Sequence, residues 1–454
     1  MKKLKKQNNT TKVALFAGAT ALMALTPNLH AQSTDDALIN KLEQKGILTV
    51  DEAKEMRAEN ATNSVNDFNT ALGSKFPMPD WVTGYKLSGD FRGRFDDTSS
   101  DNASIVARER LRYRLRVGLT VNMKDNLEVG FRLGSGDNSQ GSPSNPLSNN
   151  QTLSSDGSKK PLYIDTAYGK WTPINDGTWL VAGTFGKMVN PFDASPMVFD
   201  PDYTPEGAAL QATYKLNSAN SFRFNSGVFV LDEIKASSYD PFLSGVQIIW
   251  DAKWTPAISS SLGVAAYDIA NKGSLVNVPP YDNNLGNALG AATNFISNYN
   301  PIVVSGNVTY TLDKFPLYNG AFPVKLAGEY MNNPATTGNN IGWWGGVTFG
   351  KSGKKGAWDI SYRYQQLDAN AWWDQIVDDD NVAVFYPAYT PGSSTTLTGG
   401  TDIKGHLVKF NYSLTDALTF TFTCYANSLI NTPALPAGAK TDALHLMADI
   451  MWKF

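Results

Sequence analysis

Residues 108–119, RERLRYRLRVGL, carry an arginine at every second position: Arg108, Arg110, Arg112, Arg114 and Arg116. From Leu111 onward, the residues between them are apolar or aromatic. In an α-helix, residues two apart lie roughly 200° apart around the axis, so these arginines would surround it. In a β-strand, successive side chains point to opposite faces, and the pattern gives one basic and one apolar face. We therefore interpret the segment as a strand whose guanidinium groups can pair with carboxylates or line a path for anions.

Composition limits what the basic face can bind. A soluble nucleic-acid-binding segment is the simplest alternative, but such segments do not interleave large apolar residues so regularly. The chain starts with MKKLKK, followed by an uncharged run over residues 13–25 and a small residue at position 31. This pattern is typical of a signal peptide, so we expect residues 1–31 to be removed. Without its five lysines, the mature chain has 34 basic against 42 acidic residues, and we expect no nucleic-acid partner.

The residues that could ligate a metal ion are few. The single cysteine, Cys424, excludes an internal disulfide framework. Of the three histidines, one lies within the first 31 residues, and no cluster of histidine and cysteine suggests a metal site. We therefore expect no cofactor and no metal.

The period-two alternation recurs from Trp81 to the end of the chain. For example, residues 85–95 separate Tyr85, Leu87 and Phe91 from Lys86, Asp90, Arg92 and Arg94. The pattern predicts sixteen strands, with an error of about two because pattern alone defines strand ends poorly. They are expected near 84–95, 107–122, 127–135, 161–172, 178–187, 208–216, 221–231, 244–255, 259–269, 301–312, 322–331, 341–350, 356–367, 403–413, 417–427 and 443–454.

The connections between these strands alternate in length. Several are tight, such as KDN, PINDG, NSAN, KSGKKG and LTD, whereas 136–160, 188–207, 270–300 and 368–402 are longer than compact soluble domains usually tolerate. Short turns on one side and long loops on the other are typical of an up-and-down transmembrane barrel. We predict an all-β fold in which residues 81–454 form an antiparallel outer-membrane β-barrel.

A soluble β-sandwich would also alternate, because it buries one face of each sheet. Sixteen long strands, with aromatic residues near many strand ends, favour the barrel instead. The last strand carries one apolar face that runs to Phe454, and a terminal aromatic residue resembles the signal for outer-membrane assembly. In a barrel, a charge facing lipid costs about 2–4 kcal/mol at the midplane, so the arginines must face the lumen.

Residues 32–80 differ in composition from the barrel. Leu38, Ile39 and Leu42 have helical spacing before Gly46, and Thr49 with Glu52 forms a capping box. We expect a short periplasmic helical hairpin followed by a polar tether. This segment is either a plain spacer or an element that trimerises, plugs the pore or contacts the cell wall.

Several motifs resemble the bacterial outer-membrane proteins called putative porins and, more distantly, the phosphate-selective porins. They are KGILTVDEA, LSGDFRGRF, RERLRYRLRVGL, DTAYGKW and, most specific, the pair GTFGKMVNPF and FDPDYTPEGAAL. These motifs run through most of the mature chain. The resemblance implies a passive diffusion channel of the bacterial outer membrane, commonly a homotrimer, surrounded by lipid and lipopolysaccharide. It does not supply a solute.

The resemblance places a candidate constriction in loop 188–207, because in general porins the third long loop folds inward and narrows the channel. The apolar residues of this loop suit packing against an inner wall. Its carboxylates would face the basic wall and create a transverse field that screens solutes by charge. The loop carboxylates are Asp193, Asp200, Asp202 and Glu206, and the wall arginines are Arg92, Arg94, Arg108, Arg110, Arg112, Arg114, Arg116 and Arg132. Alternatively, the carboxylates cap turns and the arginines pair with barrel acids such as Asp90, Glu109 and Glu128.

The charge preference of such a pore stays open at this level. The arginines favour anions, whereas the acidic balance and the run Asp378–Asp380 favour cations. We expect that run to be a solvated loop tip, with weak divalent binding as a variant. Trp372 and Trp373 are expected to pack their loop onto the rim, the other possibility being an apolar slide for sugars.

Two other classes of function compete with transport of small hydrophilic solutes. An outer-membrane enzyme would need a nucleophile and base or an acid pair at the barrel edge, but His406 and His445 lie on separate predicted strands without a serine motif. We expect no enzymatic activity. A structural role, linking the outer membrane to the cell wall through residues 32–80, is the stronger alternative and is compatible with transport.

Overall fold

The computed structural model describes residues 79–137, 145–235, 237–275, 285–287, 298–386, 395–431 and 440–454. Residues 80–454 form one compact unit. The predicted signal peptide and all but the last two residues of the predicted segment 32–80 lie outside the described residues, as does the structural role assigned to that segment. Among the described helices, none is long and apolar enough to cross a membrane.

Sixteen long strands build the barrel in the described part of the chain, and each corresponds to one of the sixteen predicted segments. The prediction of an antiparallel β-barrel is thereby confirmed. The largest difference is at the first strand, which extends to Ser99 rather than residue 95. The strands are β1 (Val82–Ser99), β2 (Arg108–Met123), β3 (Leu127–Ser135), β5 (Leu162–Asn175), β6 (Trp179–Lys187), β7 (Glu206–Lys215), β8 (Asn220–Val230), β9 (Phe242–Lys253), β10 (Ile258–Ala270), β11 (Ile302–Leu312), β12 (Phe322–Asn332), β13 (Ile341–Gly350), β14 (Trp358–Leu367), β17 (Ile403–Ser413), β18 (Leu418–Leu429) and β19 (Ala443–Lys453).

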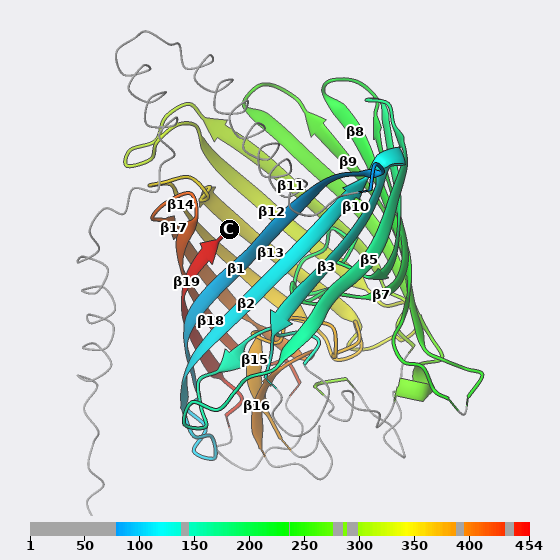
Figure 1. Ribbon diagram of the computed structural model, residues 1–454. Coiled ribbons are helices and arrows are strands. Elements are labelled where there is room, and N and C mark those ends of the chain that lie inside the picture. The colour runs from blue at the N-terminus through cyan, green and yellow to red at the C-terminus, as the bar shows by residue number, and fades with distance from the viewer. Residues whose placement is uncertain are drawn as a thin grey trace, which may run out of the picture. The chain divides into compact units, whose positions relative to one another are not determined.

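Short elements lie in the connections. The two-residue strand β4 (Gln151–Thr152) pairs with β2, and β15 (Val382–Phe385) pairs with β16 (Thr396–Gly399) as a separate hairpin. Two 3₁₀ turns, η1 (Lys124–Asn126) and η2 (Lys272–Leu275), follow β2 and β10. Figure 1 shows the β15–β16 hairpin at the end of the barrel that carries the long loops.

The barrel closes where the first and last strands meet. β1 pairs antiparallel with both β2 and β19, and Phe91 lies opposite Trp452 (Figure 1). Phe454 continues this seam, since its backbone N–H donates to the Gly89 carbonyl and Gly89 N–H donates to its carbonyl. A Cβ at Gly89 would lie 2.5 Å from the Phe454 ring, so glycine is required here. Closure removes all sheet edges and excludes the soluble sandwich.

The two faces of each strand differ as the alternation predicts. Large apolar side chains cover the outside, where Leu111 is 58% exposed and Ile164 is 62% exposed. On β2, the alternate residues Arg110 to Arg116 point into the barrel and contact other charged side chains. The outside is therefore an apolar band suited to lipid, and the inside is polar.

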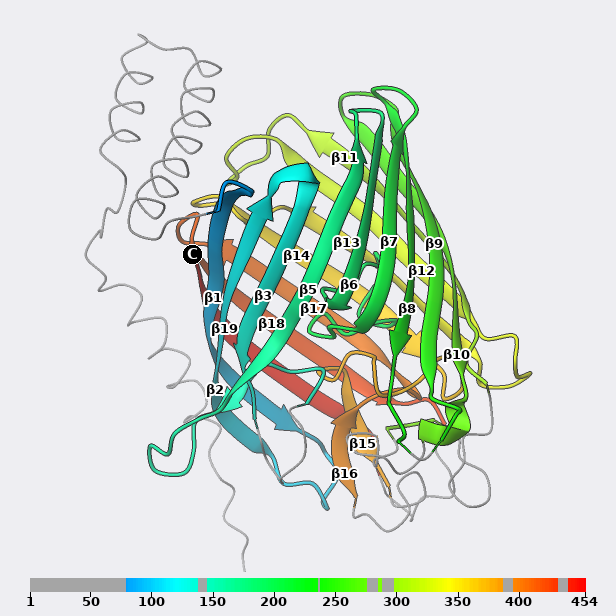
Figure 2. The ribbon, with the colours of Figure 1, turned by 45° about the vertical axis from the view of Figure 1, so that its right-hand side comes forward.

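Part of the lumen is filled by a hydrophobic core. Two inward segments, 188–205 after β6 and 368–377 after β14, pack against the inner faces of β8–β12 (Figure 2). Their aromatic rings meet the wall directly, as where Phe199 and Trp372 both contact Tyr267. Members of this core include Met188, Phe192, Val198, Phe199, Phe229, Leu243, Tyr267, Val303, Met331, Trp372, Trp373 and Ile376. The remaining open space consequently lies off-centre.

Candidate functional site

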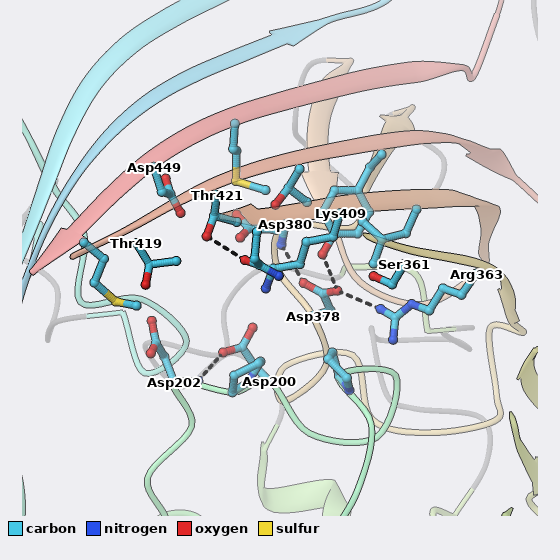
Figure 3. Close-up of a pocket in the computed structure, with 18 of the residues that line it drawn as sticks. Asp200, Asp202, Ser361, Arg363, Asp378, Asp380, Lys409, Thr419, Thr421 and Asp449 are labelled. Atoms are coloured by element: carbon cyan, nitrogen blue, oxygen red, sulfur yellow. Dashed lines mark hydrogen bonds and ion pairs between the residues drawn. The ribbon is translucent and has the colours of Figure 1, made fainter. Parts of the chain in front are cut away.

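One open part of the lumen is a cavity of about 660 Å³ on the side of β1, β2, β12–β14 and β17–β19. A second cavity, of about 410 Å³, lies beside β5–β8 and is lined by residues such as Lys170, Gln211 and Arg223. Figure 3 shows Lys409, Thr421 and Asp449 projecting from the strands toward the larger cavity, with Asp200 and Asp202 on the loop across from them. Its wall is strongly polar because the alternation leaves hydroxyl, amide and charged side chains on the inner faces of these strands. Besides the charged residues, it includes Ser148, Asn150, Thr348, Ser361, Asn411, Thr419, Thr421 and Thr423.

Four arginines of β2 pair with aspartates of β1 and of the first inward loop. Arg110 and Arg112 lie 2.9 and 3.2 Å from the buried Asp96 carboxylate. Arg114 and Arg116 both lie 2.8 Å from Asp90 and also contact Asp202, at 3.1 and 3.2 Å. These three carboxylates thus offset much of the positive charge of the four arginines.

The two arginines of β1 are compensated in the same way. Arg94 lies 2.7 Å from Asp449 on β19 and 3.3 Å from Asp380 in the second inward loop. Arg92 lies 3.8 Å from Asp449 and donates to the Asn150 side chain.

Of the predicted wall arginines, Arg92, Arg94 and Arg114 line the cavity, and the others lie outside it. Arg132 pairs with Asp165, which a bulge in β5 turns toward the lumen. Arg108, at the start of β2, is exposed. Among the predicted acidic partners, Asp90 does pair with arginines, Glu128 accepts a hydrogen bond from Tyr168, and Glu109 faces outward.

The four predicted loop carboxylates separate into two groups. Asp200 and Asp202 lie at the cavity, and Asp202 contacts the arginine wall at ion-pair distance rather than across open water. Asp193 instead pairs with Arg223 on β8, on the far side of the barrel, at 2.8 Å. Glu206 starts β7 and pairs with Lys187 outside the cavity, where its side chain is 64% exposed.

The second inward loop was not predicted, and the expectation of a solvated acidic tip was wrong. Asp378 is 5% exposed, accepts a hydrogen bond from Tyr425 and lies 3.6 Å from Arg363. Trp372 and Trp373 are fully buried in the lumen core rather than on the rim or along a solute path. The segment 368–377 lies inside the barrel because burial of its apolar side chains there is favourable. The sequence shows the same kind of apolar residues in loop 188–207.

Burial changes the protonation of these loop acids. Burial first, and then the carboxylates of Asp379 and Asp378, raise the pKa of Asp200 well above its usual range. Burial and the neighbouring Asp380 and Asp378 do the same to the pKa of Asp379. The carboxylates of Asp200, Asp378 and Asp379 each offer an oxygen within 4.8 Å of the others, and in the described part of the chain they are the residues that could hold a metal ion.

Four basic side chains at the cavity were not singled out from the sequence. Arg363 on β14 packs its guanidinium over the Trp344 ring, with 5.7 Å to the ring centroid, and pairs with Asp378. Lys325 on β12, Lys409 on β17 and Lys453 on β19 line the cavity and are exposed. The alternation of their strands places them on the inner face and was sufficient to find them.

Comparisons with known proteins agree with this architecture. Residues 100–312 match the family model described as putative porin. Pseudomonas putida OprB, in a structure determined at high pH, shares 13% identity with a TM-score of 0.50, covering 82% of this chain and 94% of its own. A mutant of Rh. blastica porin shares 10% identity with a TM-score of 0.41, covering 82% and 100% of the two chains. No curated protein sequence matches the chain.

The OprB likeness concerns the fold, and the likeness to the porin family rests on the sequence match over residues 100–312. Over residues 100–312 the chain is similar to the putative porin family, and with its barrel fold it is a porin-like β-barrel of the bacterial outer membrane.

Proposed function

We propose that this channel lets small hydrophilic solutes or ions diffuse passively through a water-filled lumen. In this proposal the path is narrowed between loop 188–207 and the arginine-lined wall of β1 and β2, with loop 368–402 closing the other flank. Solutes would pass through the polar cavity beside β1, β2, β12–β14 and β17–β19, because packed apolar side chains of the two inward loops occupy the space against β8–β12.

The observation that carries the proposal is the contact of Asp202 with Arg114 and Arg116. It supports an inward loop held at the basic wall, which is how a constriction forms inside a wide barrel. A barrel of 16 to 18 strands otherwise leaves a broad aqueous channel. Fixed charges at the narrowest place would act strongly on a passing solute.

The proposal is tested with purified mature protein in planar bilayers and in liposomes. We expect discrete single-channel steps in KCl, and liposome swelling rates that fall with the size of uncharged sugars. Detergent without protein and heat-denatured protein are the controls. Folded protein that inserts into the bilayer and gives no steps and no swelling would overturn the proposal.

The assembly is a further part of the proposal. The continuous apolar outer face supports residence in lipid and lipopolysaccharide, and the family resemblance supports a homotrimer. Native mass measurement in detergent should give three copies, and a mass of one copy at all detergent concentrations would contradict the trimer.

A further inference from the structure

Charge selectivity in this channel need not follow from the arginines. Each of the six inward-facing arginines of β1 and β2 lies within 4 Å of a carboxylate: Arg92, Arg94, Arg110, Arg112, Arg114 and Arg116. A paired guanidinium presents a dipole rather than a net charge to a passing ion. The arginine wall therefore stabilises the barrel more than it selects ions by charge.

The acids of the two inward loops are compensated as well. Asp202 contacts Arg114, Asp380 contacts Arg94, and Asp378 contacts Arg363. Asp200 and Asp379 remain, and each has a carboxylate oxygen within 4.8 Å of the other and of Asp378. The loop surface is consequently less negative than its five aspartates suggest.

Three lysines of the cavity differ from the arginines. Lys325, Lys409 and Lys453 are exposed to the cavity, and within the described residues none has a carboxylate within ion-pair distance. They come from β12, β17 and β19, so they approach the space from separate parts of the wall. Two carboxylates act electrostatically on Lys409: Asp449, which is paired with Arg94, and Asp359, which accepts hydrogen bonds from Ser352 and Asn411.

We propose that Lys325, Lys409 and Lys453 form the anion path of this channel and make it prefer small anions over cations. Seven side chains lining the cavity are basic and six are acidic, and the lysines are the basic ones without an ion-pair partner. A low-dielectric wall that carries one sign of unpaired charge concentrates ions of the opposite sign. Lysine ammonium groups are also compact point charges that can exchange partners as an anion passes.

This inference rests on the proposed channel, and its test separates the two. Single-channel currents of the mature protein are recorded in a planar bilayer under a KCl gradient. The expected reversal potential lies toward that of chloride. The triple variant Lys325→Gln, Lys409→Gln, Lys453→Gln should conduct, with its reversal potential shifted toward that of potassium, and each single variant should shift in the same direction.

The matched control is Lys404→Gln, on the same strand as Lys409 but on the opposite face, outside the cavity. It should leave the reversal potential unchanged. Folding of every variant is checked by its β-strand circular dichroism and its shifted mobility in unheated gels. Conductance with wild-type reversal toward potassium, or a triple variant with unchanged reversal, would overturn the lysine path while leaving the channel intact. Absence of any conductance would overturn the channel and the lysine path together.

Discussion

Arg114 Nη1 lies 3.1 Å from Asp202 Oδ1, which joins the middle of β2 to a loop that follows β6, 88 residues later in the chain. The same arginine contacts Asp90 on the neighbouring strand at 2.8 Å. The side chain therefore links two barrel strands to the loop that crosses the lumen. This contact sets the distance between loop 188–207 and the wall of β1 and β2, and therefore the width of the cavity between them.

Removing the loop side of this contact should widen the path. In Asp202→Asn, Arg114 and Arg116 keep Asp90 but lose a charged partner, so the loop is held less tightly and the wall becomes more positive. We expect a larger and noisier single-channel conductance, with reversal shifted toward chloride. Glu206→Gln is the control, because its partner Lys187 lies outside the cavity, and it should behave as wild type. Equal effects of the two variants would contradict this role of Asp202.

The pair of Arg94 and Asp449 should matter for stability more than for transport. Their side chains are only 6% and 8% exposed, and removing one partner of a buried pair costs about 3–5 kcal/mol because the other charge stays buried. Arg94→Met should lower the free energy of unfolding in urea by an amount of this order. The control is Lys354→Met, which removes an ion pair with Asp416 at 3.5 Å in which the lysine side chain is 85% exposed. This variant should change the free energy of unfolding by about 1 kcal/mol or less. A similar loss for both variants would contradict the account.

The buried tryptophan of the second inward loop should hold that loop inside the barrel. Trp372 is fully buried and its indole N–H donates to the Val198 carbonyl at 2.8 Å, so it joins the two loops. Trp372→Ala removes packing worth about 3–5 kcal/mol and should release loop 368–402, raising both the conductance and the cleavage of the loop by protease. The control is Trp343→Ala, on the outer face of β13, which should change neither the conductance nor the cleavage of the loop. Unchanged conductance in Trp372→Ala would show that the loop stays in place without it.

The strands could be predicted because the signal for them is local. Arg110 to Arg116 alternate with apolar residues, and each side chain faces either lipid or water whatever distant parts of the chain do. The same rule places Lys409 on the inner face of β17. Tight turns such as Lys124–Asn126 fix where neighbouring strands pair.

The path of the loops could not be predicted from a local pattern. Asp193 and Asp202 belong to one loop, yet the first pairs with Arg223 and the second with Arg114. Their positions depend on how the loop crosses the barrel, which the packing of Phe192 and Phe199 against Tyr267 determines. Asp378 is a similar case, since its burial follows from Trp372 and Trp373 rather than from its acidic neighbours.

Stability should depend on pH through Asp374. Burial raises the pKa of Asp374 to about 6, although Oδ2 of its carboxylate accepts the Leu285 backbone N–H at 2.7 Å. A folded-state pKa above the unfolded value near 3.8 favours the protonated, folded protein. The resulting stabilisation is complete below about pH 3.8 and is lost as the pH rises through about 6.

The pH dependence is measured as the difference in unfolding free energy between the wild-type protein and the Asp374→Asn variant. The unfolding free energy of wild type minus that of Asp374→Asn should fall from pH 4 to pH 6.5 and level off above that. Groups that titrate equally in both proteins cancel in the difference. A difference that stays constant, or that rises with pH, would show that Asp374 is ionised without penalty in the folded state.

The central claim, that the water path runs through the polar cavity of the lumen, is tested most directly by cysteine modification during current recording. Native Cys424 is first replaced by serine, and single cysteines are then introduced as Ser361→Cys and Thr421→Cys at the cavity and Ala265→Cys in the hydrophobic core of the lumen. A charged methanethiosulfonate reagent should lower the current in discrete steps for the two cavity variants and leave the Ala265→Cys current unchanged. Current that falls for Ala265→Cys and stays constant for both cavity variants would place the path on the other side of the barrel and contradict the account.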